Sequence, residues 1–150
     1  MKKINYVISA CLLGIPCRFN GVAKPNKKAL KVYLSGKAIA VCPEIFAGLP
    51  TPRPACEIKA GEGNGVILGK AKIVDEKGND FSKQFISGAN LVLTEIIEKH
   101  DVKYAILKSG SPSCGVSVIY SGKFDGKKKK GSGVFSELLK EKKVKLIEVN

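Results

Sequence analysis

Five cysteines carry the clearest chemical signal in this 150-residue chain, and three of them follow short apolar runs. These three are Cys11 after residues 4–9, Cys42 after residues 37–41 and Cys114 beyond residues 104–107. A free cysteine usually behaves as a small buried hydrophobe, but three cysteines at equivalent strand ends are better explained by a shared site. Such a site could bind an iron–sulfur cluster or present reactive thiols.

The two remaining cysteines, Cys17 and Cys56, are less well placed, and we predict that both are bystanders. An odd number of cysteines in a lysine-rich chain indicates a reducing compartment rather than a disulfide framework. Residues 2–11 imitate a lipoprotein signal, yet their apolar stretch is short and contains Asn5, which favours a buried first strand. We therefore expect a cytoplasmic protein.

Several familiar catalytic arrangements do not fit the sequence. Zinc sites generally include a closely spaced pair such as C-x-x-C, which the chain lacks. The only histidine, His100, falls at the end of an expected helix, so no base is evident for a Cys–His pair or a serine hydrolase. Residues 110–115 read GSPSCG, which is not the nucleophile elbow G-x-S-x-G.

Polar groups near the three cysteines could complete a site. Glu44, two residues after Cys42, is the candidate acid or base. The stretch from Ser109 to Ser113 offers hydroxyls and amides that could bind an anion or substrate.

Arg18 and Arg53 are the only arginines among 26 basic residues, and both occur in loops near the cysteines. Because arginine is favoured for bidentate recognition, we predict that both side chains point into the cleft. There they would orient a carbonyl or an anionic group of the substrate, or pair with Glu44 or Glu57 to hold the loops.

The elements that must position these residues alternate along the chain. Short apolar strands are predicted at residues 4–9, 37–41, 104–107 and 145–149, with helices at 26–35, 81–100 and 132–143. Asn26 and Ser82 are the expected helix caps. This alternation predicts a single three-layer α/β domain over residues 1–150, with a mostly parallel, Rossmann-like sheet. Ligands of such sheets bind beyond the carboxyl ends of the strands, where the three cysteines are expected to converge.

The remaining segments are expected to be irregular or peripheral. Prolines in residues 43–54 predict a loop without helix, and residues 121–131 read as a loop rich in glycine and lysine. Residues 65–80 suggest a small excursion or hairpin, and residues 116–120 a further strand.

The net charge of +13 raises the alternative of an RNA-binding protein, with residues 127–130, four consecutive lysines, as its contact. No aromatic residues interleave with these lysines, so a solvated loop is the favoured interpretation. No apolar run approaches the roughly 20 residues that span a membrane, and we expect no membrane association. No obligate protein partner is evident.

Three blocks of sequence resemble a known family. Residues 9–14 read SACLLG, residues 42–44 read CPE with GLPTPR at 48–53, and residues 108–115 read KSGSPSCG. Together they are similar to the signature blocks of the thiouracil desulfidases, a bacterial family long described only as a domain of unknown function, and the resemblance extends over nearly the whole chain.

The resemblance implies a 4Fe-4S cluster held by Cys11, Cys42 and Cys114, with one iron open to substrate. It also implies that Glu44 and Ser111 assist proton transfer and water attack. The expected partner is a small thiolated base or nucleoside, whose C=S group becomes C=O with release of sulfide. Cys17 and Cys56 fall where the family would not require cysteine, so they could compete as ligands or form an adventitious disulfide. The rival hypotheses are a non-catalytic thiol or iron–sulfur module and a protein that acts on thiolated transfer RNA.

Overall fold

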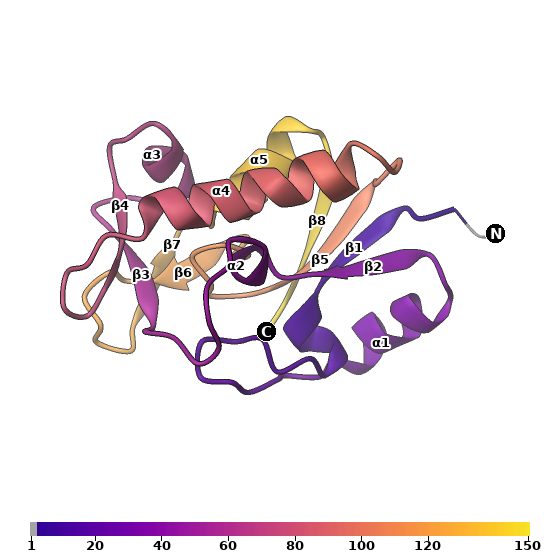
Figure 1. The fold of residues 1–150 in the computed structure, drawn as a ribbon, viewed down its shortest axis with the longest axis horizontal. Coiled ribbons are helices and arrows are strands. Elements are labelled where there is room, and N and C mark those ends of the chain that lie inside the picture. The colour runs from indigo at the N-terminus through magenta and orange to yellow at the C-terminus, as the bar shows by residue number, and fades with distance from the viewer. Residues whose placement is uncertain (1–2) are drawn as a thin grey trace.

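The computed structural model describes residues 3–150, and the chain forms an α/β fold around a parallel sheet (Figure 1). The strands are β1 (Tyr6–Ser9), β2 (Ala38–Val41), β3 (Cys56–Lys59), β4 (Lys72–Asp75), β5 (Tyr104–Lys108), β6 (Val118–Tyr120), β7 (Lys128–Lys130) and β8 (Lys145–Val149). The helices are α1 (Lys27–Leu34), α2 (Pro43–Phe46), α3 (Gly63–Ile67), α4 (Ser82–Val92) and α5 (Val134–Glu141). A 3-10 turn, η1 (Ala10–Leu13), follows β1, and a π-helical segment, η2 (Leu93–Ile97), extends α4.

The central sheet has the strand order β2-β1-β5-β8, and all of its pairs are parallel. The chain moves outward from β1 to β2 and then crosses back to β5 on the other side of β1. The direction of the connections therefore reverses between β1 and β5. A crevice for ligands is expected outside the carboxyl ends of these two strands.

Helices cover both faces of the sheet, with α1 on one side and α4 and α5 on the other (Figure 1). Successive buried residues of one strand serve opposite faces, because strand side chains alternate. Val7 and Leu107 pack in the core that includes α4 and α5, whereas Ile8 and Ile106 pack against the core on the α1 side. This two-sided burial explains why the central strands read as continuous apolar runs.

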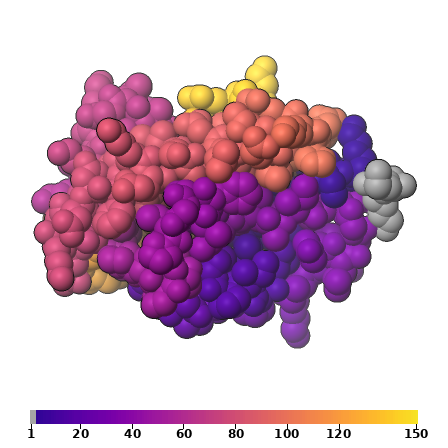
Figure 2. All heavy atoms as spheres, in the orientation of Figure 1, coloured from indigo at the N-terminus to yellow at the C-terminus, as the bar shows by residue number. Residues whose placement is uncertain are grey.

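Two small antiparallel hairpins, β3–β4 and β6–β7, lie at the carboxyl-end side of the sheet (Figure 1). Figure 2 shows the loops that follow β1 and β2, coloured indigo and purple, side by side on one face. The backbone N–H of Arg53 donates to the carbonyl of Phe19 at 2.8 Å and so joins these two loops.

The predicted α/β class and mostly parallel sheet are confirmed, but several local expectations were wrong. Residues 43–46 form a helix because Pro43 occupies its first turn, where a missing N–H costs nothing. Residues 128–130, expected in a loop, pair with β6, and β6 belongs to this hairpin rather than to the central sheet. Within residues 65–80, β4 pairs mainly with the earlier strand β3.

Ser82 does not cap α4 as expected. Its hydroxyl oxygen instead accepts a hydrogen bond from the backbone N–H of Ile73 at 2.9 Å. The side chain of Asp80 accepts from the backbone N–H of Ser82, so the carboxylate takes the position nearest the helix start. Asn26 caps α1 as predicted, since its side chain accepts from the N–H of Ala29.

Within residues 3–150, no helix combines the length and the apolar character that crossing a membrane would require.

Candidate active site

All five cysteines line one cavity of about 350 Å³ beyond the carboxyl ends of β1, β2 and β5. Cys11 lies in η1, Cys42 directly precedes α2, and Cys114 lies in the turn that follows β5. Cys17 comes from the long loop after η1, and Cys56 begins β3. None of the five takes part in a disulfide. The strand ends therefore bring together the three predicted ligands, together with both cysteines that were expected to be bystanders.

Cys17 lies between two of the predicted ligands. A side-chain hydrogen bond with Cys11 raises the pKa of Cys17 to about 11, although contact with Cys42 lowers it in part. The thiol of Cys42 lies 3.9 Å from the carbonyl oxygen of Cys17, to which it donates. The hydrogen bond with Cys17, followed by burial, raises the pKa of Cys42. Sequence spacing gave no reason to place Cys17 here, because its position depends on the path of the loop.

Two further thiols, those of Cys56 and Cys114, are held in their neutral form. Burial raises the pKa of Cys114 and raises that of Cys56 to about 12. Cysteines must lose their protons to bind metal, so a metal would have to displace these protons.

The donor set suits an iron–sulfur cluster better than a single ion. In the described part of the chain, no set of three or more His, Cys, Asp or Glu side chains is arranged to hold one metal ion. A cluster differs, because each iron takes its own thiolate and the ligand sulfurs stand apart. Soft thiols on several sides of one cavity, without histidine in its lining, fit this requirement.

Glu44 lies in the first turn of α2 and lines the same cavity. Its Oε1 accepts from Nε of Arg53 at 3.1 Å, and its Oε2 accepts from the hydroxyl of Ser113 at 3.3 Å. Burial raises the pKa of the Glu44 carboxyl, while Arg53 and then Ser113 offset part of this effect. The carboxylate is therefore a stronger base than an exposed glutamate.

Ser111 stands at the start of the turn that positions Cys114. Its Oγ accepts from the backbone N–H groups of Ser113 and Cys114, both at 3.0 Å. A hydroxyl that accepts two hydrogen bonds still has its own proton to donate. Among residues 3–150 no acceptor takes this proton, and Ser111 lines the cavity, where the proton is available to a bound molecule.

Charges of both signs line the cavity, since Arg18, Arg53 and Lys108 are accompanied by Glu44, Glu57 and Glu76. Arg18 and Lys108 contribute to its lining, and burial followed by repulsion from Lys24, Arg18 and Lys128 lowers the pKa of Lys108. No hydrogen-bond or ion-pair partner for the Arg18 guanidinium occurs in the described chain. Ser109 also lines the cavity, but its hydroxyl donates to Oδ1 of Asn150 at 2.9 Å.

Most of the residues predicted from the sequence to form the site line this cavity. They are Cys11, Arg18, Cys42, Glu44, Arg53, Ser109, Ser111 and Cys114. Ser113 is buried behind the lining, where it contacts Glu44. Cys17, Cys56, Lys108 and Tyr120 also line the cavity and were not predicted to do so. For Cys17 the sequence offered only its closeness to Cys11, which does not determine the path of the intervening loop.

The sheet and this cavity define an α/β protein with a thiol-rich site at the switch point of its strand order. The family model of 2-thiouracil desulfurase matches residues 6–150, and the chain belongs to that family. A Bacillus subtilis protein, uncharacterized protein YbbK, is 41% identical over 144 residues, which cover 96% of this chain and 95% of the relative. The solved structure of a [4Fe-4S]-dependent thiouracil desulfidase, TudS, is similar with a TM-score of 0.83 and 36% identity, over 97% of this chain and 91% of TudS.

Proposed function

We propose that this protein is an iron–sulfur-dependent desulfidase that replaces the sulfur of a thiolated pyrimidine by oxygen. The net reaction consumes one water and releases one hydrogen sulfide as C=S becomes C=O, without change of oxidation state. The observation that carries this proposal is the single cavity where five cysteines meet Glu44 and Ser111. Membership of the 2-thiouracil desulfurase family supports it.

Cys11, Cys42 and Cys114 would hold a 4Fe-4S cluster, as thiolates donated from the ends of three parallel strands. A bound cluster with one iron free of protein ligands supplies a Lewis acid for the sulfur of the substrate. The [4Fe-4S] dependence stated for the similar protein TudS supports this choice of cofactor.

Glu44 is the base in this proposal. Its raised pKa matches the task, because a more basic carboxylate removes a proton from water more readily. Oε2 accepts only one hydrogen bond among residues 3–150, from Ser113, and retains a lone pair for a water molecule. Glu44 would take a proton as water attacks the C=S carbon and return it to the departing sulfur.

Ser111 would direct its free hydroxyl proton toward the water or the ring substituent of the substrate. Its oxygen is fixed by two backbone N–H groups, so the direction of this donor is set before substrate binds. Arg18, which has no partner in the described chain, would contact a carbonyl or an anionic group of the substrate. Arg18 and Lys108 would favour a negatively charged or hydrogen-bond-accepting group on the thiolated base or nucleoside.

The proposal is tested by anaerobic reconstitution with iron and sulfide, followed by sulfide release from 2-thiouracil, 4-thiouracil and 4-thiouridine. We expect turnover by the reconstituted protein and none by the metal-free protein. Glu44→Gln should keep the cluster absorbance and lose about 100-fold or more in turnover number, as expected for a general base. Replacing Cys11, Cys42 or Cys114 by alanine should abolish both signals.

The controls separate the rival functions. A stable cluster with no turnover on any thiolated base or nucleoside would identify a non-catalytic thiol or iron–sulfur module. Full turnover after Cys114→Ala would remove that residue from the ligand set. Cys56 also lines the cavity, but it lies on β3 rather than at an end of the central sheet. Cys56→Ala should therefore keep the cluster absorbance, and its loss would add Cys56 to the ligand set.

A further inference from the structure

All three guanidinium nitrogens of Arg53 have partners within the protein. Nε donates to Oε1 of Glu44 at 3.1 Å, and Nη2 lies 3.0 Å from the same oxygen. Nη2 also donates to the carbonyl of Cys17 at 2.8 Å. Nη1 donates to the carbonyl of Pro50 and to the hydroxyl of Thr51, at 3.2 and 3.0 Å. An arginine has five N–H donors, and these contacts amount to four hydrogen bonds and one ion-pair contact within the protein.

The side chain of Arg53 is also hidden from solvent, with an exposed fraction of 5%. Arg18 differs from Arg53 in its hydrogen bonding. It lines the same cavity, and its guanidinium has no hydrogen-bond or ion-pair partner among residues 3–150. The two arginines that the sequence grouped together therefore occupy different environments.

The contacts of Arg53 join three segments that are separate in the chain. They are the loop that carries Cys17, helix α2 with Glu44, and the Pro50–Thr51 turn. The Cys17 carbonyl that accepts from Arg53 also accepts from the thiol of Cys42. One guanidinium thus connects the carboxylate of Glu44 with the backbone carbonyl of Cys17, to which the Cys42 thiol also donates.

We infer that Arg53 is a positioning residue, which holds the Glu44 carboxylate at a fixed place beside the cysteines and does not bind substrate. The inference rests on the proposed function for its catalytic consequence. A planar, bidentate donor is required, because a lysine ammonium could not reach the Glu44, Cys17, Pro50 and Thr51 oxygens at once.

The first test uses the metal-free protein and needs no activity. In a ¹⁵N–¹H spectrum, the Nε–H signal of Arg53 should be present at neutral pH and exchange slowly with solvent, whereas that of Arg18 should exchange rapidly. Glu44→Gln should shift the Arg53 signal and leave the Arg18 signal in place. An Arg53 signal that exchanges as fast as that of Arg18, or that ignores Glu44→Gln, would overturn the inference.

The second test measures sulfide release by reconstituted Arg53→Lys, Arg53→Gln and Arg18→Lys. A misplaced catalytic group typically costs about 10- to 100-fold, and we expect a loss of this size in kcat for both Arg53 variants. Their KM should stay within about twofold of the wild type, because Arg53 does not contact substrate. Arg18→Lys should instead raise KM. A raised KM with unchanged kcat in Arg53→Lys would make Arg53 a binding residue and overturn the inference.

A double-mutant cycle with Glu44→Asp separates indirect from independent effects. If Arg53 acts through the carboxylate, Arg53→Lys should cost less than about threefold in the Glu44→Asp background. Multiplicative losses would contradict this. Iron and sulfide content, measured for every variant, shows whether a loss arises from an incomplete cluster. If the wild type holds a cluster but releases no sulfide, the proposed function fails. The ¹⁵N–¹H spectrum of the metal-free protein then decides whether Arg53 holds the Glu44 carboxylate.

Discussion

Cys17 makes more contacts within the candidate site than its place in the sequence indicates. From the sequence we expected Cys17 to be a bystander, because the ends of the strands accounted for only three cysteines. In the structure its thiol contacts both Cys11 and Cys42, and its carbonyl accepts from Arg53 and from Cys42. A residue in this position can affect the site even if it is not a ligand.

The thiols of Cys17 and Cys56 in the metal-free protein should be unreactive at neutral pH. The pKa of Cys17 is raised to about 11 and that of Cys56 to about 12, so both are protonated at neutral pH. Because the thiolate is the nucleophile, alkylation by iodoacetamide should accelerate about tenfold per pH unit between about pH 7 and about pH 10. Mass spectrometry of the alkylated peptides under anaerobic, reducing conditions measures each rate. A rate that levels off near pH 8.5, as for an ordinary thiol, would contradict the prediction.

Gly88 allows helix α4 to pack closely against helix α2. Helix α4 packs against α2 at Gly88, where a Cβ atom would lie 2.0 Å from the carbonyl oxygen of Pro43 and 2.8 Å from Cβ of Ala47. Since α2 begins directly after Cys42 and includes Glu44, this close approach places part of the candidate site.

Gly88→Ala should therefore destabilise the protein, even though alanine favours helix over glycine by about 1 kcal/mol. Forcing an extra carbon into a tight contact typically costs about 1–3 kcal/mol, and backbone atoms cannot rotate away. Denaturant unfolding of the metal-free protein measures the change. Ser87→Ala, on the exposed side of the same helix, is the control and should be neutral or slightly stabilising. Equal stability of the two variants would mean that α2 moves freely relative to α4.

Glu148 of β8 fixes the segment that leads from Cys114 to β6. It accepts hydrogen bonds from the backbone N–H groups of Val116 and Ser117, both at 2.9 Å. Burial opposes ionisation, but these bonds and the Ser117 hydroxyl hold the pKa of Glu148 below its ordinary value of 4.5.

A lowered pKa in the folded state predicts a stability contribution that is present above about pH 4.5 and is lost as the pH falls through the folded value. Glu148→Gln should lower the unfolding free energy by about 1–2 kcal/mol near pH 7, because an amide replaces the charged acceptor. The difference from the wild type should shrink as the pH falls below about 4.5. Thermal unfolding of both proteins between about pH 7 and the pH range below 4.5 measures this difference in stability. A difference that does not change with pH would contradict the prediction that Glu148 ionisation stabilises the fold.

The elements divide into those that the sequence could predict and those that depend on neighbours. The central strands and α1 were predictable, because buried runs and the Asn26 cap are local signals. The convergence of Cys11, Cys42 and Cys114 on one cavity followed from strand topology alone. The pairing of Arg53 with Glu44 was one of the roles expected for the arginines, and the structure contains it. The contacts of Cys17 could not be predicted, because they arise between loops. The strand at Lys128–Lys130 exists because it pairs with β6 and because Lys129 donates to the carbonyl of Ile58.

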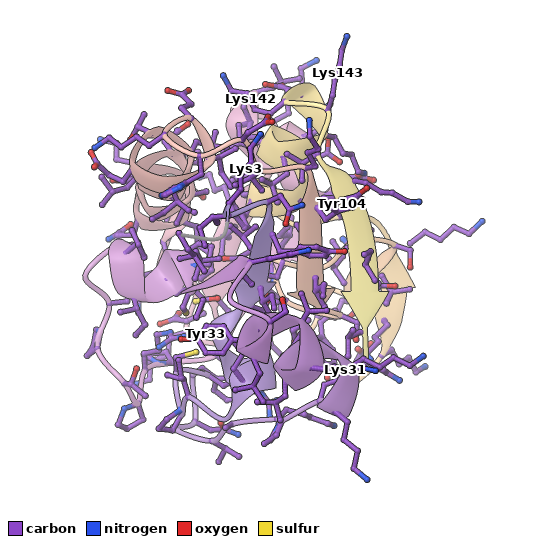
Figure 3. The ribbon with its side chains drawn as sticks, turned by 90° about the vertical axis from the view of Figure 1, so that its right-hand side faces the viewer. Lys3, Lys31, Tyr33, Tyr104, Lys142 and Lys143 are labelled. Atoms are coloured by element: carbon purple, nitrogen blue, oxygen red, sulfur yellow. The ribbon has the colours of Figure 1, made fainter. Side chains whose placement is uncertain are left out.

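At the scale of the whole molecule, the charge of +13 is distributed over exposed lysines. Figure 3 shows Lys142 and Lys143 next to each other at one end of the molecule and Lys31 near the other end. Hydrated lysines spread in this way attract polyanions without recognising a sequence.

Any binding of RNA should therefore depend steeply on salt. We expect electrophoretic shifts at low ionic strength that disappear by about 0.2 M salt, the behaviour of counterion release. A variant with Lys127, Lys128 and Lys130 replaced by glutamine should weaken the shift equally for thiolated and unthiolated transfer RNA. Binding that persists at higher salt and prefers thiolated RNA would instead support the alternative of an RNA-acting enzyme.

The order of the central sheet has a further consequence during protein synthesis. Strand β5 lies beside β1, although roughly a hundred residues separate them, and Cys114 follows β5. At roughly 5 to 20 residues per second, the 58 residues from Cys56 to Cys114 take about 3 to 12 seconds to synthesise. Until then the nascent chain can complete neither the central sheet nor the set of five cysteines that line the cavity. Any cofactor that needs Cys114 must be loaded after nearly the whole polypeptide has emerged.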